Sequence, residues 1–160
     1  MTHDDDLKTI NDIIKSTRFA TVTTRTSTGD LVSRPLAVLS HEFEGTVWFF
    51  TQDPSPKTAD IAFDAHVNVS YIDGQNTVSL AGTATMSRDQ ARIDEFWNLF
   101  AQAWFEGGRA DPTVALLQVD ATSIEFWDSD KPAISRAFEV VKGLITRSAP
   151  HVGENRTIEL

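Results

Sequence analysis

The sequence predicts a mainly β domain of the α+β kind, an antiparallel barrel of short strands with flanking helices. Two observations lead to this fold class. About five short strand-like runs follow one another at hairpin spacing in the first half of the chain, which is typical of an antiparallel barrel. Helical periodicity is confined to a few segments around them. The chain has 160 residues and is expected to form one domain, 1–160, that buries roughly 70% of its unfolded surface.

The first half is expected to begin with a helix and to continue mostly in strands. The order is an amphipathic helix at 4–16, strands at 19–25, 31–39 and 46–51, a short helix from Pro56 to about Phe63, and strands at 66–72 and 77–86. Strict alternation of apolar and polar residues indicates that 66–72 is a half-buried strand. The polar, glycine-ended segment 41–45 predicts a hairpin between the strands on either side of it. Gly82 indicates a bulge or bend in the last strand.

The second half is expected to contain two helices, two strands and a tail. A helix starts near Ser87 and breaks at Gly107, strands follow at 114–119 and 123–128, and a helix from Ala133 to about Ile145 precedes a polar tail at 146–160. The first of these helices carries more aromatic surface than one helix face normally needs. We therefore expect most of its aromatic side chains in the core and favour an interface for Trp104 and Phe105.

The composition argues against several functional classes. Fourteen basic and 23 acidic residues give a formal charge of −9, which argues against a nucleic-acid or anionic-membrane partner, since such surfaces are rich in Lys and Arg. No apolar run approaches the length of a membrane-spanning helix, and the acidic start lacks the regions of a signal peptide. The chain has no cysteine, so no disulfide or thiol chemistry is expected. We expect a cytoplasmic protein.

The side chains offer no catalytic machinery of their own. The four histidines are scattered, with no carboxylate at metal-ligand spacing, so no metal site is expected. The sequence contains neither a hydrolase nucleophile elbow nor a glycine-rich dinucleotide or phosphate loop. Because no nucleophile or acid–base pair stands out, no catalytic residue is assigned. Any chemistry is expected to come from a cofactor.

A short stretch after the third strand has the features of an anion site. Ser55 stands at the N-cap of the expected short helix, with Pro56 at its first position. The first turn of a helix has unpaired N–H groups and a partial positive charge, and Lys57 adds an ammonium group. Thr58 stands where a capping box has Glu or Gln, so no carboxylate competes for these donors. The stretch fits either a phosphate site or a capped helix with a solvated lysine.

Several motifs occur in an order that is characteristic of one family. They are Ser33-Arg34-Pro35, Trp48-Phe49-Phe50-Thr51 followed by Ser55-x-Lys57, Val67-x-Val69-Ser70-Tyr71, Val78-Ser79-x-x-Gly82 and Glu125-Phe126-Trp127-Asp128-Ser129. In this order they resemble the flavin-binding split-barrel proteins related to pyridoxamine 5′-phosphate oxidase, in their general-stress-protein branch. The chain's ending is also similar to that branch, so the resemblance covers nearly the whole sequence.

The resemblance implies a six-stranded antiparallel split barrel that forms a homodimer and holds FMN in two clefts between the subunits. The cofactor-binding residues that it implies are Arg34, Pro35, Leu36, Ala37, Phe50, Thr51, Ser55, Lys57, Thr77 and Trp127. The first four would line the flavin along one strand, and the next two would contact the ring system and the ribityl chain. Ser55 and Lys57 would hold the phosphate, in agreement with the anion site argued above.

Three further positions follow from the same resemblance. Thr77 falls where relatives often place a flavin-contacting Gln, and Trp127 matches a tryptophan that closes the site from the partner chain. Pro56 replaces a second basic residue of the family. Phosphate binding is therefore expected to be either weaker or shared with Arg34.

Two departures from the family pattern bear on the substrate. Leu39 replaces the lysine with which the true oxidases bind the substrate phosphate, and Asp128-Ser129-Asp130-Lys131-Pro132 replaces their Arg-and-His motif. A phosphorylated vitamer would therefore lack its charged partners. The resemblance implies that this chain is not a pyridoxamine phosphate oxidase.

Two functional hypotheses remain. The first is an FMN-dependent oxidoreductase that takes hydride from a nicotinamide donor, passes electrons to an unknown small-molecule acceptor, and has a substrate pocket walled by Trp104 and Phe105. The second is a non-catalytic flavin-binding or flavin-buffering general stress protein. A third, less favoured possibility is haem binding, as in some split-barrel relatives, which would need an axial ligand such as His66.

Overall fold

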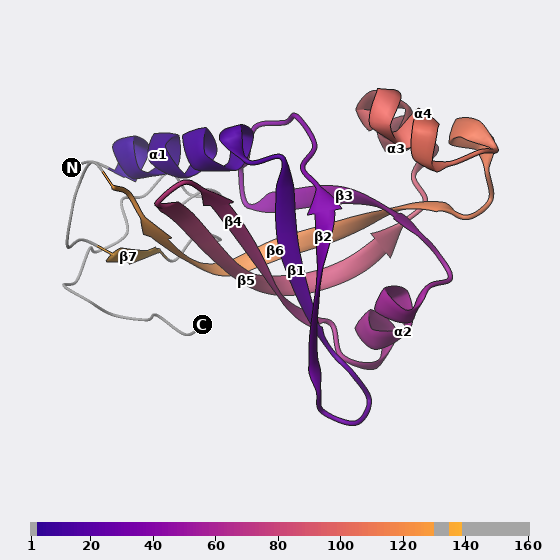
Figure 1. Cartoon of the computed structure of the whole chain (residues 1–160), viewed down its shortest axis with the longest axis horizontal. Helices are drawn as coiled ribbons and strands as arrows, with labels where there is room; N and C mark the ends of the chain where they lie inside the picture. The colour runs from indigo at the N-terminus through magenta and orange to yellow at the C-terminus, as the bar shows by residue number, and fades with distance from the viewer. Residues whose placement is uncertain (1–2, 130–134, 139–160) are drawn as a thin grey trace.

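The structure is a computed structural model that describes residues 3–129 and 135–138 (Figure 1). The elements are α1 (His3–Ser16), β1 (Phe19–Arg25), β2 (Leu31–Ala37), β3 (Thr46–Gln52), α2 (Pro56–Phe63), β4 (His66–Asp73), β5 (Asn76–Ser87), α3 (Gln90–Phe96), α4 (Leu99–Trp104), the 3₁₀ turn η1 (Gly108–Ala110), β6 (Val114–Trp127) and β7 (Ser135–Phe138). Within these described residues, no helix combines the length and apolar character needed to cross a membrane.

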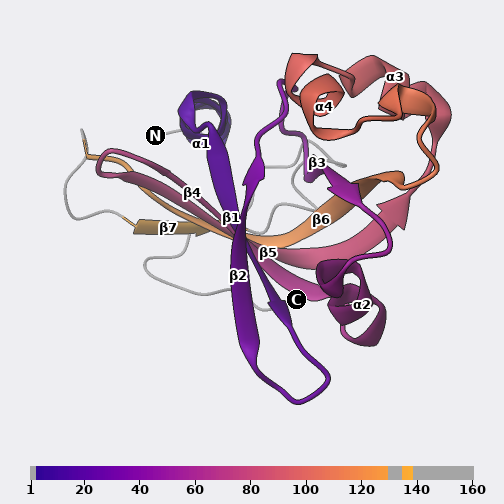
Figure 2. The same ribbon diagram turned by 45° about the vertical axis from the view of Figure 1, so that its right-hand side comes forward.

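One curled antiparallel sheet organises the fold (Figures 1 and 2). Its strand order is β2-β1-β4-β5-β6-β3, and β7 pairs with β6 outside this path. The helix α1 packs on β4 and β5, whereas α3 and α4 form a separate cap near the start of β6. This arrangement confirms the predicted fold class, a mainly β, six-stranded antiparallel split barrel with flanking helices.

Two hydrophobic cores lie on opposite sides of β3. The main core joins the apolar face of α1 to the inner face of the sheet, and it includes Ile10, Ile14, Val22, Phe49, Tyr71, Leu80 and Phe126. The second core lies beneath α3 and α4 and consists of Leu39, Ile93, Ala101, Phe105, Val114 and Leu116. Because side chains alternate across a strand, Val47 and Phe49 enter the main core while Trp48 and Phe50 pack against the second.

The predicted hairpin between strands 31–39 and 46–51 is wrong. Among the described strands, β2 pairs with β1 alone, through a tight turn at Gly29, and β3 pairs with β6 at the other edge of the sheet. The segment 38–45 therefore crosses between the two edges instead of turning back. Its backbone is tied to α1, because the Asn11 amide accepts the Phe43 N–H at 2.8 Å and donates to the Phe43 carbonyl at 3.2 Å. A polar, glycine-ended connection alone cannot distinguish a crossing from a hairpin.

Two predictions for the second half, one helix and two strands, also need correction. The single helix near 87–105 is two helices, because the Asn98 side chain accepts the Ala101 N–H and starts α4 anew. The two strands at 114–119 and 123–128 are one continuous strand, β6, which pairs with β5 through a register shift at Ala81/Gly82. That shift confirms the predicted bulge.

The last predicted helix, 133–145, is contradicted in part. Within it, Ser135–Phe138 forms strand β7 against the end of β6, with Ser135 opposite Trp127. Pairing with an open strand edge outweighs the helical spacing of the apolar residues here. The rest of that segment and the predicted tail, 146–160, lie outside the described residues.

Candidate functional site

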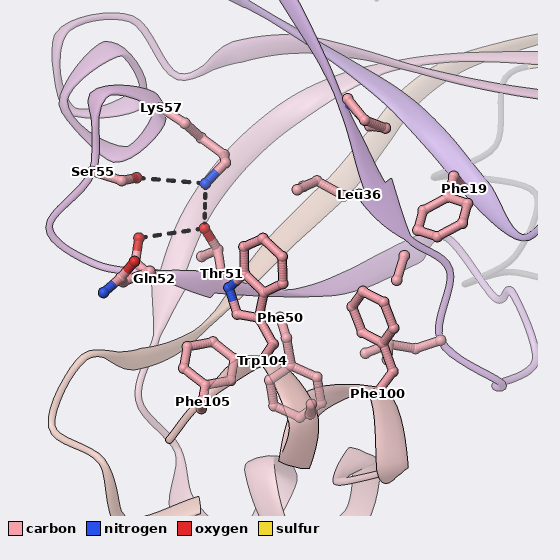
Figure 3. A pocket seen from close by; sticks show the side chains of 14 residues that line it. Phe19, Leu36, Phe50, Thr51, Gln52, Ser55, Lys57, Phe100, Trp104 and Phe105 are labelled. Atoms are coloured by element: carbon pink, nitrogen blue, oxygen red, sulfur yellow. Dashed lines mark hydrogen bonds between the residues drawn. The ribbon is translucent and has the colours of Figure 1, made fainter. Parts of the chain in front are cut away.

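A cavity of about 310 Å³ lies where the second core meets β2, β3 and the start of α2. Its lining comes from five places in the sequence: Phe19, Pro35, Leu36, Ala37, Leu39, Phe50, Thr51, Gln52, Ser55, Lys57, Phe100, Ala101, Trp104 and Phe105. Figure 3 shows that the polar side chains of Lys57, Ser55, Thr51 and Gln52 gather at one end, while aromatic rings continue from Phe50 and Phe105 beside them to Phe19 and Phe100 at the other end. The cavity is therefore amphipathic along its length.

The polar end is organised by the first turn of α2. Ser55 caps the helix, because its Oγ accepts the Thr58 N–H at 3.3 Å, and the Thr58 hydroxyl accepts the Ser55 N–H at 2.9 Å. A capping box is thus present although position 58 holds neither Glu nor Gln, and, as expected, no carboxylate takes part in it. The Thr58 hydroxyl replaces the usual carboxylate, so the box adds no negative charge. We call Ser55, Lys57 and this first turn the anion site.

Lys57 carries the positive charge of the anion site. Its Nζ donates to Thr51 Oγ1 and to Ser55 Oγ (Figure 3), and both acceptors are neutral. Among the described residues, no carboxylate lies within ion-pair distance of this ammonium group. Burial lowers the pKa of Lys57, repulsion from Arg34 lowers it further, and Asp53 opposes both. A half-buried ammonium without a contacting counter-ion is suited to bind an anion.

Arg34 stands beside this site but does not line the cavity. Its Nη1 donates to Thr24 Oγ1 at 2.6 Å, and its Nη2 lies 3.6 Å from Asp60 Oδ2 on α2. Burial lowers the pKa of Arg34, and the Asp60 carboxylate counteracts this. The next three residues of β2 do line the cavity. Arg34 therefore links β2 and β1 to α2 and adds positive potential near Lys57.

The other end of the cavity is aromatic. The rings of Phe100 and Trp104 stack with 6.3 Å between centroids and 10° between planes, and Phe19 meets Phe100 edge-on at 6.1 Å. Trp104 is 66% exposed, whereas Phe105 is 4% exposed and packs edge-on against Phe50 at 6.4 Å. The two residues predicted as a pocket wall both line the cavity, but Phe105 is also part of the second core.

Thr77 and Trp127 lie away from this cavity. They are paired with each other at one end of the β5–β6 ladder. At the other end, Leu116 of β6 pairs with Ser87 of β5 on one side and with Phe50 of β3 on the other. Trp127 is eleven positions after Leu116 along β6, a strand path of about 36 Å at the usual rise per residue. The sequence-derived set thus divides into one group at the cavity and another at the far end of the sheet.

Four residues that line the cavity were not among the site residues or departures named from the sequence: Phe19, Gln52, Phe100 and Ala101. One of them was within reach of sequence reasoning. Phe100 and Trp104 are four positions apart, and side chains at this spacing share one helix face. Recognising Asn98 as an N-cap would have placed both rings on the same side of a short helix.

His66 and the other metal-ligating side chains do not contribute to the cavity. The His66 side chain is largely exposed, and its Nδ1 lies 2.8 Å from Asp64 Oδ1. The described cavity lining contains no His, Cys or Met. Across residues 3–129 and 135–138, no group of three or more His, Cys, Asp or Glu side chains is arranged to hold a metal ion.

Comparison with known proteins identifies the family. The family description "Pyridoxamine 5'-phosphate oxidase like" matches residues 5–151. The chain belongs to this family. Protein bli-3 of Neurospora crassa is a relative that is 29% identical to this chain over 167 residues. The match spans 97% of this chain and 80% of the relative.

Two solved structures extend the comparison. A protein related to general stress protein 26 from Clostridium acetobutylicum superposes with a TM-score of 0.75 at 17% identity, covering 88% of this chain and 98% of that one. The general stress FMN/FAD binding protein of Xanthomonas citri has a TM-score of 0.69 at 25% identity, covering 81% and 94%. The first supports the fold alone. The second shows that this chain is similar to a protein whose name states that it binds FMN or FAD.

Proposed function

We propose that the chain binds FMN in the amphipathic cavity and acts as a flavin-dependent oxidoreductase with a nicotinamide donor and a small-molecule acceptor. The observation that carries this proposal is the combination, in one cavity, of a half-buried ammonium group at one end and aromatic walls at the other. The Xanthomonas citri relative, named as an FMN/FAD binding protein, supports flavin as the ligand.

The lining fits each part of FMN. Phe50, Leu36 and Ala37 offer an apolar surface for the ring system, and the Thr51 hydroxyl and Gln52 amide are hydrogen-bonding groups for the ribityl hydroxyls. Lys57 and Ser55 supply donors for the phosphate. The volume of about 310 Å³ lies at the lower end of the range for ligand pockets. A second chain is therefore expected to complete the site.

The separation of the predicted residues supports a site shared between two subunits. Trp127 lies about 36 Å of strand path from the residue opposite Phe50, so one flavin cannot easily contact Trp127 and Lys57 of the same chain. Both can contact one flavin when Trp127 and Thr77 come from a partner. We therefore include the homodimer, with FMN at the subunit interface, in the proposal.

A bound flavin would supply the hydride and electron transfer for which the cavity side chains have no groups. The chain's own part is to bind the phosphate, to orient the ring between β3 and α4, and to exclude water with Phe50 and Phe105. Trp104 borders the open side of the cavity. A donor or acceptor ring is expected to approach along it.

Pyridoxamine phosphate is not the proposed substrate. Leu39, which stands where the resemblance implies a phosphate-binding lysine, is buried in the second core and lines the cavity. Lys57 is the one basic residue among the described lining residues, and the proposal assigns it to the FMN phosphate. A second phosphate on the substrate would meet an apolar wall, at a large desolvation cost.

The purified protein provides the first test. We expect it to show the near-ultraviolet and blue absorption bands of oxidised flavin, and to release FMN on denaturation. Under anaerobic conditions, NADH or NADPH should bleach the blue band, and an added electron acceptor should restore it. A colourless protein that takes up no FMN would refute the binding proposal.

The alternative function, a non-catalytic flavin-buffering stress protein, is favoured by one feature of the cavity. Its described lining contains no His, Asp or Glu side chain that could move a proton. The same anaerobic experiment separates the two functions. Bound FMN that neither NADH nor NADPH bleaches would support buffering, whereas rapid bleaching followed by turnover would support the oxidoreductase.

A further inference from the structure

Arg88 connects three segments around the anion site although it does not line the cavity. Its Nη2 donates to Asp53 Oδ2 at 2.8 Å and to the Asp53 carbonyl at 3.3 Å. Its Nη1 donates to the Pro112 carbonyl at 2.6 Å and to the Val114 carbonyl at 3.3 Å. The guanidinium thus joins the end of β5 to the segment between β3 and α2 and to the start of β6.

Asp53 is an acidic residue just before the anion site in the sequence, and its charge acts on Lys57. It lies two positions before the helix cap Ser55, and its N–H donates to the Thr113 carbonyl at 2.9 Å. Together with the bonds from Arg88, this contact fixes the chain that leads into α2. The positions of Ser55 and Lys57 therefore depend on an anchor outside their own helix.

The charge of Asp53 acts on Lys57. The Asp53 carboxylate raises the pKa of Lys57, against the larger lowering by burial and the repulsion from Arg34. A carboxylate that attracts the ammonium group also repels a phosphate dianion bound to it. The Arg88 guanidinium, paired with Asp53, offsets this repulsion.

We propose that Arg88 is a positioning residue for the anion site, and that it neutralises the Asp53 carboxylate and fixes the segment before α2 so that Ser55 and Lys57 can bind a phosphate group. This inference rests on the proposed function, because the phosphate is that of FMN. It adds a residue from a third segment to the site. No sequence motif marks it.

Riboflavin separates this role from a purely structural one. It has the ring and the ribityl chain of FMN but lacks the phosphate, so a charge effect at the anion site changes FMN binding alone. The dissociation constants of both ligands are measured by flavin fluorescence on the full chain. The variants are Arg88→Gln, Asp53→Asn and their double variant, with Arg92→Gln as the matched control. Arg92 is a nearby arginine on α3 that lies over the Trp48 ring at 4.3 Å.

The wild-type protein is expected to bind FMN more tightly than riboflavin. Arg88→Gln should weaken FMN binding about tenfold, the equivalent of a single charged interaction, and should change riboflavin binding by less than about twofold. Removing the carboxylate as well, in the double variant, should restore most of the FMN affinity. Arg92→Gln should leave both ligands unaffected.

Two results would overturn the inference. FMN binding by Arg88→Gln that equals that of the wild-type protein would show that Asp53 needs no neutralisation. An equal loss for FMN and riboflavin, without recovery in the double variant, would show that Arg88 is only a structural clamp. Failure of the proposed function looks different, because the wild-type protein itself would then show no preference for FMN.

A measurement without flavin tests the electrostatic part independently. NMR titration of the Lys57 ammonium group should show a higher pKa in Arg88→Gln, because a positive charge is lost and Asp53 is unpaired. The pKa should fall back in the double variant. An unchanged pKa in Arg88→Gln would contradict the inference. If Arg88→Gln does not fold, Arg88→Lys, which keeps the charge but loses the fork of donors, should retain the FMN preference at reduced stability.

Discussion

In the proposed site, Lys57 would give the cavity its preference for an anion at the expense of stability. The unfolded chain solvates its ammonium group fully, whereas the folded chain half-buries it beside neutral hydroxyls and near Arg34. The pKa of Lys57 is lower in the folded than in the unfolded protein. At a pH between the folded-state and unfolded-state pKa values, the unfolded protein therefore binds more protons than the folded protein. The free energy of unfolding consequently rises with pH across this range. Below this range, the charged Lys57 costs the ligand-free protein stability.

Replacing Lys57 with Met should therefore affect binding and stability in opposite directions. The variant keeps the aliphatic stem but loses the charge. FMN binding should weaken by about 1.5–3 kcal/mol, the usual worth of a charged hydrogen bond, while riboflavin binding stays unchanged. The melting temperature of the ligand-free protein at neutral pH should be equal or higher. Fluorescence titration and thermal unfolding measure the two effects.

The control for this variant is Lys8→Met. Lys8 is an exposed lysine on α1 that pairs with Asp12 at 2.6 Å and does not line the cavity. The Lys8→Met variant should therefore bind FMN and riboflavin as tightly as the wild-type protein. Equal FMN affinity in Lys57→Met and the wild-type protein would mean that Lys57 is only a solvated lysine on a capped helix.

The pH dependence of FMN binding follows from the same pKa. As pH rises through the lowered pKa of Lys57, the ammonium group loses its proton and FMN affinity should fall. Lys57→Arg keeps its charge throughout this range, so its affinity for FMN should persist to higher pH. Riboflavin controls for ionisation of the flavin ring. An alkaline loss of FMN affinity that is identical in Lys57→Arg and the wild-type protein would contradict the assignment.

Within α4 and its C-terminal boundary, neighbouring aromatic residues have different roles. Phe105 is buried in the second core, so Phe105→Ala should lower the free energy of unfolding by about 3–5 kcal/mol. Trp104 is mostly exposed, and Trp104→Ala should change that free energy by less than about 1 kcal/mol. It should instead alter flavin fluorescence or the rate of reduction by the nicotinamide, because it borders the open side of the cavity. Urea unfolding and stopped-flow absorbance would measure these effects.

Leu99→Ala is a control for that comparison. Leu99 is also exposed on α4, but it does not line the cavity. It should leave both the stability and the flavin signal close to those of the wild-type protein. A Trp104→Ala variant with unchanged flavin properties would remove Trp104 from the substrate pocket.

The β5–β6 ladder depends on the absence of a side chain at one position. A Cβ atom at Gly82 would lie 2.4 Å from the Asp120 carbonyl oxygen and 2.9 Å from Val119 Cγ1. The backbone oxygen belongs to the paired strand and cannot rotate away. Gly82→Ala should therefore lower the free energy of unfolding by at least about 2 kcal/mol, measured by urea unfolding.

Gly74 provides the contrast. It has φ of +61° in the β4–β5 turn, and no atom lies within 4 Å of an added Cβ. Asn tolerates this left-handed conformation, so Gly74→Asn should cost less than about 1 kcal/mol. If Gly82→Ala and Gly74→Asn have equal free energies of unfolding, the close backbone contact at Gly82 does not determine the stability of the β5–β6 pairing.

Local patterns predict most elements of the fold, because their information is local. The alternation in 66–72 and the capped start of α2 both depend on residues a few positions apart, and the structure confirms these elements. The pairing partner of β3 is not local. β3 pairs with β6 while β2 pairs with β1, and the segment between β2 and β3 is held at Phe43 by Asn11 of α1. Such contacts leave no periodicity in the sequence.

The candidate site shows the same division. Ser55 and Lys57 are adjacent to a helix start, so local sequence marks them as candidates for an anion site, and the structure places both in the cavity lining. Phe19 and Phe100 meet only because β1 and α4 come together in space. Arg88 reaches Asp53 across 35 positions of sequence. Residues of this kind can be found only from tertiary structure.

The length of the sheet relates the fold to the proposed dimer. The helix α2, which carries Lys57, and the C-terminal end of β6, which carries Trp127, lie toward opposite ends of the curled sheet (Figure 1). The resemblance nevertheless assigns both residues to one flavin. A two-fold axis brings a given patch on one chain against a different patch on its partner, and vice versa. Two equivalent sites would then form, each with Lys57 from one chain and Trp127 from the other.

Mixed dimers test this arrangement directly. Lys57→Met and Trp127→Ala homodimers should each bind FMN weakly, because both of their sites carry one defect. A dimer with one chain of each kind should have one intact site and one doubly defective site, so mixing the variants should restore tight binding of one FMN per mixed dimer. Refolding the variants together with distinguishable tags, followed by tandem purification and FMN titration, gives this stoichiometry. Mixed dimers that form but recover no tight site would place Lys57 and Trp127 in the same chain's site, or exclude Trp127 from flavin binding.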